Sequence, residues 1–507
     1  MRKKIGILAL MGALVMPVAG QAGQHEGDLA TQIEALSRQL EELKAQVARV
    51  DQEQQEQQEQ ISAIDNTVWH DMSTRFHWSG DFRTRYDYYS RDRYDVANPN
   101  TTINEKNKSL VSNRLRLNMY AQVQENVEFV GRLAMHKAWG LQNAPEDQGG
   151  FFGGFPAIDG NSGRRLDDDK LLVDRAIVNW NNIGGSNFWF SVGRRPTTDG
   201  MPNQLRQNEE RRMATPVSYM DWPFDGLTIG YAYDQLFNAI ALPGRIRFCY
   251  GRGFEAGLGA DTIKDTDFMG ISWDIYNQGD RFVYFQSYIA MDVFNYPDFA
   301  DPLFNAFAPD MMGPRQNIGD IYHTSALYLD KWQNLNYFVA GAWSRTDPNQ
   351  HGMFNDPIAM MMGAGPNTSS ENGYSVYVGV RYDLPQQPFK VGLEFNYGSE
   401  YWIGMSPGHD DIYASKLATR GQVYEVYGIY EIPGRAVSRL GRAFIRAGYQ
   451  HYRYDYTGSL DWNLRPYDVG SAADRQTVAA LAEALGPMTP AMVDKADQVY
   501  VTFEAKF

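Results

Sequence analysis

From residue 75 to the C-terminus, apolar and polar side chains alternate with a period of two. In residues 114–123, for example, Leu115 and Leu117 fall on one face, and Arg114 and Arg116 fall on the other. Such alternation is typical of strands with one apolar and one water-facing side. The apolar face points inward in a soluble β-sandwich and outward, toward lipid, in a membrane barrel. The lengths of the connections distinguish these two classes.

Sixteen segments show this pattern: 75–90, 109–124, 126–138, 170–181, 187–195, 224–234, 243–252, 267–276, 280–294, 315–331, 335–346, 373–384, 388–399, 417–432, 440–457 and 496–507. Every second connection is short, whereas the intervening ones are long, such as 139–169, 196–223 and 458–495. Barrels with short periplasmic turns and long external loops have this arrangement, and single-chain bacterial barrels have an even number of strands. We therefore predict an all-β transmembrane barrel of about sixteen antiparallel strands in residues 73–507.

The N-terminus indicates export. Arg2, Lys3 and Lys4 precede a short apolar stretch that ends near a small-residue cleavage site at Ala22. This pattern predicts a signal peptide over residues 1–22. The chain has one cysteine, Cys249, so an internal disulfide, a zinc site made of cysteines and a covalent c-type haem site are all excluded. We interpret Cys249 as a small residue of the barrel wall.

Residues 23–72 are predicted to form a periplasmic coiled-coil segment. Apolar residues recur at alternating spacings of four and three, and they are Leu29, Ile33, Leu36, Leu40, Leu43, Val47 and Val50, with Ile61, Ile64 and Val68 in the same register. A heptad pattern favours association of identical helices, because a lone amphipathic helix is marginal in water. A trimerisation stalk or a spacer that faces peptidoglycan would account for it. The alternative is a helix that folds back on its own barrel.

The final strand carries the most specific motif. Its apolar face ends with Phe503 and with Phe507, the last residue. A terminal aromatic on an alternating strand resembles the signal that the barrel-assembly machinery reads. Together with the leader, the heptads and the sixteen segments, it makes the chain resemble the trimeric outer-membrane porin superfamily. The stalk ahead of the barrel is similar to porins of the phosphate- and polyphosphate-selective type. The layout also resembles a family of uncharacterised bacterial outer-membrane proteins.

The predicted inward face is rich in arginine. The candidate pore-lining residues are Arg83, Arg85, Arg114, Arg116, Arg132, Arg175, Arg245 and Arg247, with Arg381, Arg442 and Arg446 further along the chain. The predicted inward acids are fewer, namely Asp81, Asp87, Glu128 and Glu394. Rows of guanidinium groups favour anions in channels, so we expect an anion-leaning lumen. Alternatively, these arginines pair with acids of the wall and only keep the lumen polar.

The third long connection, residues 196–223, is the candidate constriction loop. It carries Arg206, Glu209, Glu210, Arg211 and Arg212. The resemblance to porins implies that this loop folds inward and narrows the lumen. The alternative is an external loop with solvated charges. In the last long connection, residues 473–485 are predicted to form a helix.

These observations predict an outer-membrane porin for passive diffusion of small polar solutes or ions. The expected partners are outer-membrane lipid and lipopolysaccharide, the barrel-assembly machinery, small anions or polar solutes, and two further copies of the chain in a homotrimer that associates through the coiled coil and the barrel walls. The formal net charge of −14 argues against nucleic acid as a partner. No hydrolase motif accompanies the eight histidines, so we expect neither an enzyme nor a cofactor or metal site. Alternatives are a barrel that sheathes a multihaem cytochrome and a structural tether of the envelope.

Overall fold

The computed structural model describes residues 34–35, 37–38, 40–50, 76–140, 166, 170–195, 199–211, 215–217, 220–221, 224–234, 242–257, 263–295, 316–406, 411, 413–438, 441–485 and 492–507. The chain divides into two units, Met1–Ser73 and Thr74–Phe507. The predicted signal peptide lies outside the described residues, and so do residues 23–33 and 51–72 of the predicted coiled coil.

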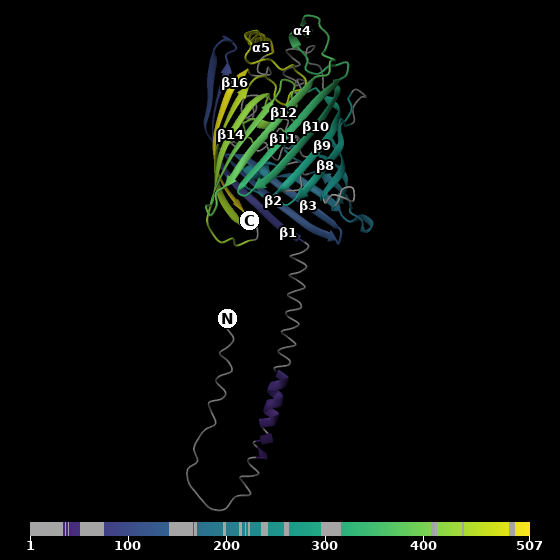
Figure 1. Ribbon diagram of the computed structural model, residues 1–507, viewed down its shortest axis with the longest axis vertical. Coiled ribbons are helices and arrows are strands. Elements are labelled where there is room, and N and C mark those ends of the chain that lie inside the picture. Colours follow the sequence, from purple (N-terminus) through teal and green to yellow (C-terminus); the bar gives the residue numbers. More distant parts are fainter. Residues whose placement is uncertain are drawn as a thin grey trace, which may run out of the picture. The chain divides into compact units, whose positions relative to one another are not determined.

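The second unit is a closed antiparallel barrel in which each strand pairs with its neighbours in sequence and β1 pairs with β16 (Figure 1). The strands are β1 (Phe76–Tyr94), β2 (Thr102–Gln124), β3 (Val127–Ala138), β4 (Leu172–Trp180), β5 (Phe188–Arg194), β6 (Asp225–Tyr233), β7 (Gly244–Phe254), β8 (Thr266–Gln278), β9 (Arg281–Phe294), β10 (Asn317–Trp332), β11 (Leu335–Pro348), β12 (Asn372–Asp383), β13 (Phe389–Gly398), β14 (Gly421–Glu431), β15 (Arg442–Tyr454) and β16 (Val493–Lys506). The predicted strand number is confirmed.

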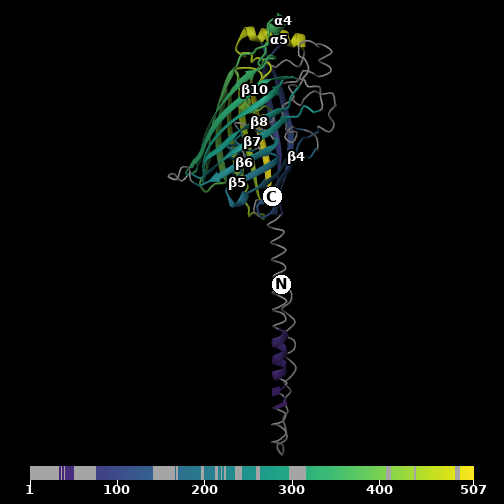
Figure 2. The same cartoon turned by 90° about the vertical axis from the view of Figure 1, so that its right-hand side faces the viewer.

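Except for the first hairpin, the short and long connections alternate as predicted, with turns at 125–126, 279–280 and 333–334 at one end of the barrel. One prediction was wrong: the first hairpin continues to residues 94 and 102, so its loop covers only 95–101 rather than 91–108. The long connections contain the short helices α2 (Asn203–Arg206), α4 (Pro357–Met361) and η3 (Lys416–Ala418), and the short connection between β4 and β5 contains η2 (Ile183–Gly185). The predicted helix of the last connection is confirmed as α5 (Ala472–Leu485), which lies with α4 at the end of the barrel opposite the C-terminus (Figures 1 and 2).

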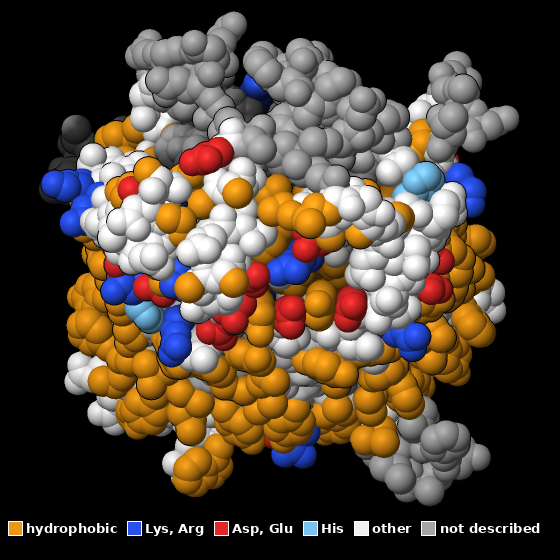
Figure 3. All heavy atoms as spheres, turned by 90° about the horizontal axis from the view of Figure 1, so that it is seen from above, with side chains coloured by type: hydrophobic (Ala, Val, Ile, Leu, Met, Phe, Trp, Pro, Cys, Tyr) orange, Lys and Arg blue, Asp and Glu red, His pale blue; other side chains and the backbone are white. Residues whose placement is uncertain are grey.

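Side chains sort by strand parity between the two faces of the wall. In β16, Val499, Val501 and Phe503 are 44%, 44% and 47% exposed on the outside. Their neighbours Tyr500 and Thr502 are each 1% exposed inside the barrel. Seen from above, hydrophobic side chains follow the flanks of the molecule, and charged side chains gather toward the middle (Figure 3). A soluble sandwich would show the opposite sorting, with its apolar faces packed against each other.

The barrel closes where the last residue meets the first strand. The Gly80 amide donates to the Phe507 carbonyl (2.8 Å), and the Phe507 amide donates to the Gly80 carbonyl (3.0 Å). A Cβ atom placed on Gly80 would lie 2.7 Å from the Phe507 ring and 2.9 Å from the carbonyl oxygen of Arg116. Glycine is therefore required at residue 80, because the terminal ring packs directly over its backbone.

In the first unit, the described residues between 34 and 50 are helical. The heptad positions Leu40, Leu43, Val47 and Val50 are 52–60% exposed. Association of this helix with other copies stays a prediction. No helix formed by the described residues is long and apolar enough to cross a membrane.

Candidate functional site

The interior of the barrel brings together most of the predicted pore-lining arginines. Those buried by surrounding groups are Arg83, Arg85, Arg114, Arg116, Arg132 and Arg247. Arg175 and Arg245 are half-buried. Burial to this extent in a wide barrel requires other parts of the chain to cover the inner wall. The role of these side chains in lining a conducting path stays a prediction.

Carboxylates neutralise much of this positive charge. Asp81 on β1 binds Arg114 (2.8 Å) and Arg116 (2.7 Å) on β2. Glu504 on β16 binds Arg446 on β15 (3.2 Å) and also reaches Arg114 (3.4 Å). Buried charges are stable only when they are paired in this way. The inner wall carries more acids than predicted, and the additional ones include Asp174, Asp274, Glu425 and Glu504.

Part of the predicted constriction loop lies inside the barrel. We call the described residues between 199 and 221 the first inner segment. Its Asp199 binds Arg116 (3.0 Å) and Arg132 (2.5 Å), and its Glu209 binds Arg116 (2.8 Å). The first inner segment is therefore held to β2 and β3 by two carboxylates that bind arginines of the wall.

Arg206 holds the same segment to the other side of the wall. Its guanidinium binds Asp411 (2.8 Å) and Glu425 on β14 (3.1 Å). Arg381 on β12 and Arg446 on β15 donate to the carbonyl oxygens of Leu205 (2.7 Å) and Arg206 (2.8 Å), respectively. The first inner segment therefore crosses the lumen and is hydrogen-bonded on both sides.

The remaining charges of the predicted constriction loop are arranged differently. Arg211 is half-buried and donates to Asn277 (2.7 Å) and to the Gly279 carbonyl (2.9 Å) at the turn between β8 and β9. Glu210 is exposed. Arg212 lies outside the described residues.

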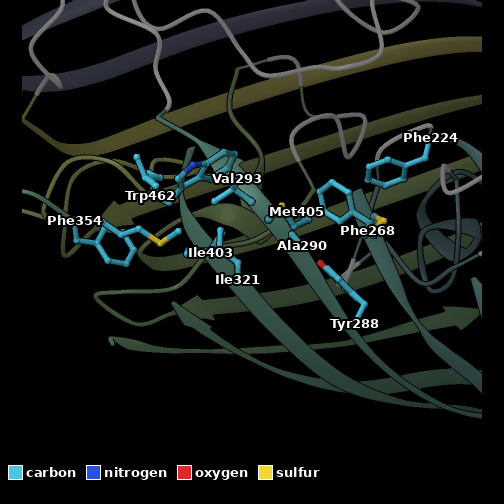
Figure 4. Packing of buried hydrophobic residues seen from close by; sticks show 13 residues of the cluster. Phe224, Phe268, Tyr288, Ala290, Val293, Ile321, Phe354, Ile403, Met405 and Trp462 are labelled. Atoms are coloured by element: carbon cyan, nitrogen blue, oxygen red, sulfur yellow. The ribbon is translucent and has the colours of Figure 1, made fainter. Parts of the chain in front are cut away.

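A second connection also enters the lumen, and we call its described residues between 399 and 420 the second inner segment. Its Trp402, Ile403 and Met405 are 0–1% exposed. Figure 4 shows Ile403 and Met405 among inward residues of β8 to β10, such as Phe268 and Ile321. The apolar lumen core formed in this way was not predicted, because inward positions of a barrel were expected to be polar.

The two inner segments also bind each other. The amide of Asp221 donates to the Met405 carbonyl (2.9 Å), and the hydroxyl of Ser406 donates to the carbonyl of Val217. Lys416 of the second inner segment binds Glu425 (2.5 Å) and Glu394. Glu425 is therefore shared by Lys416 and Arg206, so one wall carboxylate joins both segments.

A cavity of about 410 Å³ remains beside these segments and is lined mainly by β4 to β9. Its basic lining residues are Arg195, Arg245 and Arg247, and its acidic lining residue is Glu128. Cys249 also lines it, with its sulfur 3.4 Å from the Thr228 hydroxyl, so the interpretation of Cys249 as a wall residue agrees with the structure. Among the described residues, no group of three His, Cys, Asp or Glu side chains has a metal-binding arrangement.

Outside the strands, the connection between β15 and α5 contains a buried carboxyl group. Asp461 accepts hydrogen bonds from the amides of Asn463 (2.8 Å) and Leu464 (3.0 Å), and it is 3% exposed. Burial raises its pKa to about 7, although these amides and Arg420 favour the charged form. This carboxyl group therefore titrates near neutral pH.

This chain was compared with solved structures, with curated proteins and with models of protein families. OmpT, an outer-membrane protein of Vibrio cholerae, matches with 10% identity and a TM-score of 0.39, covering 85% of this chain and 97% of its own. OmpF of Salmonella typhi, solved in complex with daunomycin, matches with 9% identity and a TM-score of 0.40 over the same shares. No curated protein matches the sequence. A family model described as "Protein of unknown function (DUF3373)" matches residues 104–507, which include β2 to β16. The chain therefore belongs to this family of proteins of unknown function.

Proposed function

We propose that this protein is an outer-membrane channel for passive diffusion of small polar solutes or ions. The observation that carries the proposal is the sorting of side chains in a closed barrel, with apolar residues such as Val501 outside and charged residues such as Arg116 and Glu504 inside. A closed barrel leaves no backbone group unpaired in lipid. Its apolar outer surface suits the membrane, and its polar interior suits water and solutes.

The filled lumen favours a narrow channel over a wide one. Sixteen-stranded porins leave an aqueous channel when nothing occupies the interior. Here the two inner segments fill much of the lumen, and the cavity of about 410 Å³ remains beside them. The proposed solute path therefore runs along β4 to β9, whereas Arg116 on β2 and Arg132 on β3 anchor the first inner segment.

The same filling disfavours a sheath for a multihaem cytochrome. The part of the interior that the structure describes is occupied by the chain's own residues, including Trp402 and Arg206. A structural tether would leave the barrel closed to solutes, so conductance separates it from a channel.

The exposed heptad positions support a proposed homotrimer that associates through the N-terminal helix. The expected surroundings of the protein are outer-membrane lipid and lipopolysaccharide. The position of Phe507 at the closing seam supports its proposed role, with Phe503, as an assembly signal. Selectivity of the phosphate- and polyphosphate-selective type stays a prediction of the resemblance, and so does the absence of enzymatic activity.

Planar-bilayer recording of the purified full-length protein tests the channel. Discrete conductance steps, with a reversal potential in a salt gradient that reports anion preference, are the expected result. Folding is checked by the shift in electrophoretic mobility on heating. Folded protein that inserts without conducting ions would contradict the channel and favour the tether.

A further inference from the structure

The cavity along β4 to β9 is more positive than the rest of the lumen. Arg245 and Arg247 share a single carboxylate, Asp274, which lies 3.1 Å from Arg247. Arg195 forms no ion pair with any described residue, and its guanidinium donates only to the Ser191 carbonyl (3.1 Å). Arg247 lies close enough to Arg195 to repel it electrostatically.

The carboxylates near the cavity do not cancel this charge. Glu128 lines it but already accepts hydrogen bonds from the Asn179 amide (2.9 Å) and the Tyr120 hydroxyl (3.0 Å). Three guanidinium groups therefore face one lining carboxylate and one shared with the wall. An anion that enters would relieve the repulsion and satisfy donors of Arg195 that have no other described acceptor.

Part of the cavity lining is apolar and aromatic. The rings of Phe224 and Phe268 are tilted against each other with centroids 4.6 Å apart, and the Tyr288 ring lies 6.2 Å from that of Phe268. All three line the cavity together with Met220. Inorganic phosphate would leave this surface without a partner, whereas a ring or short hydrocarbon would bury it.

We propose that the cavity binds small organic anions that have an apolar body, with the carboxylate at Arg195, Arg245 and Arg247 and the body against Phe224, Phe268 and Tyr288. This site rests on the proposed channel function, because the solute must reach the lumen. A volume of about 410 Å³ lies within the range of about 300–1,000 Å³ that small-molecule sites occupy. Guanidinium groups bind carboxylates strongly because they combine charge with paired donors.

Cys249 provides a reporter inside the cavity, because it is the chain's single cysteine and lines the same space. The test measures the rate at which an uncharged methanethiosulfonate reagent modifies Cys249 in folded, full-length protein. Benzoate is the probe. Benzyl alcohol keeps the ring without the charge, and acetate keeps the charge without the ring.

We expect benzoate to slow the modification of Cys249 at lower concentrations than either benzyl alcohol or acetate. Arg195→Gln removes a charge-assisted hydrogen bond, so it is expected to raise the half-protecting benzoate concentration about tenfold. Arg195→Lys keeps the charge and is expected to restore part of the loss. Arg252→Gln is the matched control, because Arg252 lies on β7 with the reporter Cys249 but pairs with Asp265 and Asp267 outside the cavity lining.

Equal protection by benzyl alcohol and benzoate would overturn the anion site, and so would protection that Arg195→Gln leaves unchanged. Failure of the uncharged reagent to label Cys249 would overturn it as well, because the cavity would then be closed to solutes. Bilayer conductance separates this result from the channel proposal. A conducting protein without benzoate protection loses only the binding site, and a protected protein without conductance loses only the channel.

Discussion

Arg206 is the residue whose removal most directly tests whether the first inner segment narrows a channel. Its guanidinium binds Asp411 and Glu425, and all three side chains are buried. We consider Arg206→Met, which keeps a long unbranched side chain and removes the charge. The substitution leaves Asp411 with the Gln450 amide, and Glu425 with Lys416 and the Tyr500 hydroxyl.

The magnitude follows from the loss of one partner in a buried ion pair. Such a loss costs about 3–5 kcal/mol, and the lower end applies here because Lys416 still neutralises Glu425. About 3 kcal/mol shifts the balance between the seated and the displaced segment roughly a hundredfold toward the displaced state. The wall itself is unaffected, because the strands keep their backbone hydrogen bonds.

Single-channel recording measures this shift directly. The variant is expected to spend much more time at a higher conductance level than the wild type, with similar insertion and heat-modifiability. Arg211→Met is the control, since Arg211 lies in the same segment but binds the turn at Asn277 and Gly279. Unchanged conductance in a folded Arg206→Met protein would refute the reasoning that this segment obstructs the solute path.

Three further predictions address the seam, the external connection and the N-terminal helix. Gly80→Ala forces a methyl group against the terminal aromatic ring and is expected to destabilise the barrel by about 1–3 kcal/mol, measured by urea unfolding in detergent, whereas Ser79→Ala is expected to change little. Asp461 has a raised pKa, so the folded state loses stability as pH rises from about 4 toward about 7, by at most about 1.4 kcal/mol per pH unit. Asp461→Asn should flatten this dependence in hydrogen exchange of the amides of the connection, and an unchanged slope would contradict the assignment. Leu43→Cys in a cysteine-free background is expected to form disulfides between chains on oxidation, whereas Glu41→Cys is not, and equal yields from both would argue against a heptad seam.

The sequence predicted the wall well because strand alternation is a local signal. In the second half of β16, Val499, Val501 and Phe503 alternate with the inward residues of the strand, and the prediction of residues 496–507 differs from the observed Val493–Lys506 mainly at its start. The extension of β1 and β2 was missed because residues 91–108 are polar on both faces. The backbones of β1 and β2 stay paired in this region, but no apolar face marks these residues as strands in the sequence.

The interior was harder to predict, because its contacts join residues far apart in the chain. Asp199 and Arg116 are 83 positions apart, and Arg206 and Glu425 are 219 positions apart. Alternation assigns a side chain to the inner face, but it does not say which loop will meet it. The inward aromatics Phe268 and Tyr288 show the same limit, since their presence makes sense only when a second loop covers them.

The hydrogen-bonded contact between the two inner segments has a consequence for the assembly of the barrel in the membrane. The bond from Ser406 to Val217 links residues 189 positions apart, and each segment is held by strands on different arcs of the wall. The contact between the two segments forms only after the strands that carry both segments are in place, because contacts between residues far apart in the chain form late. During assembly the barrel would therefore pass through a stage with an unfilled lumen. The rate at which the two inner segments enter the lumen then sets how long the outer membrane stays permeable.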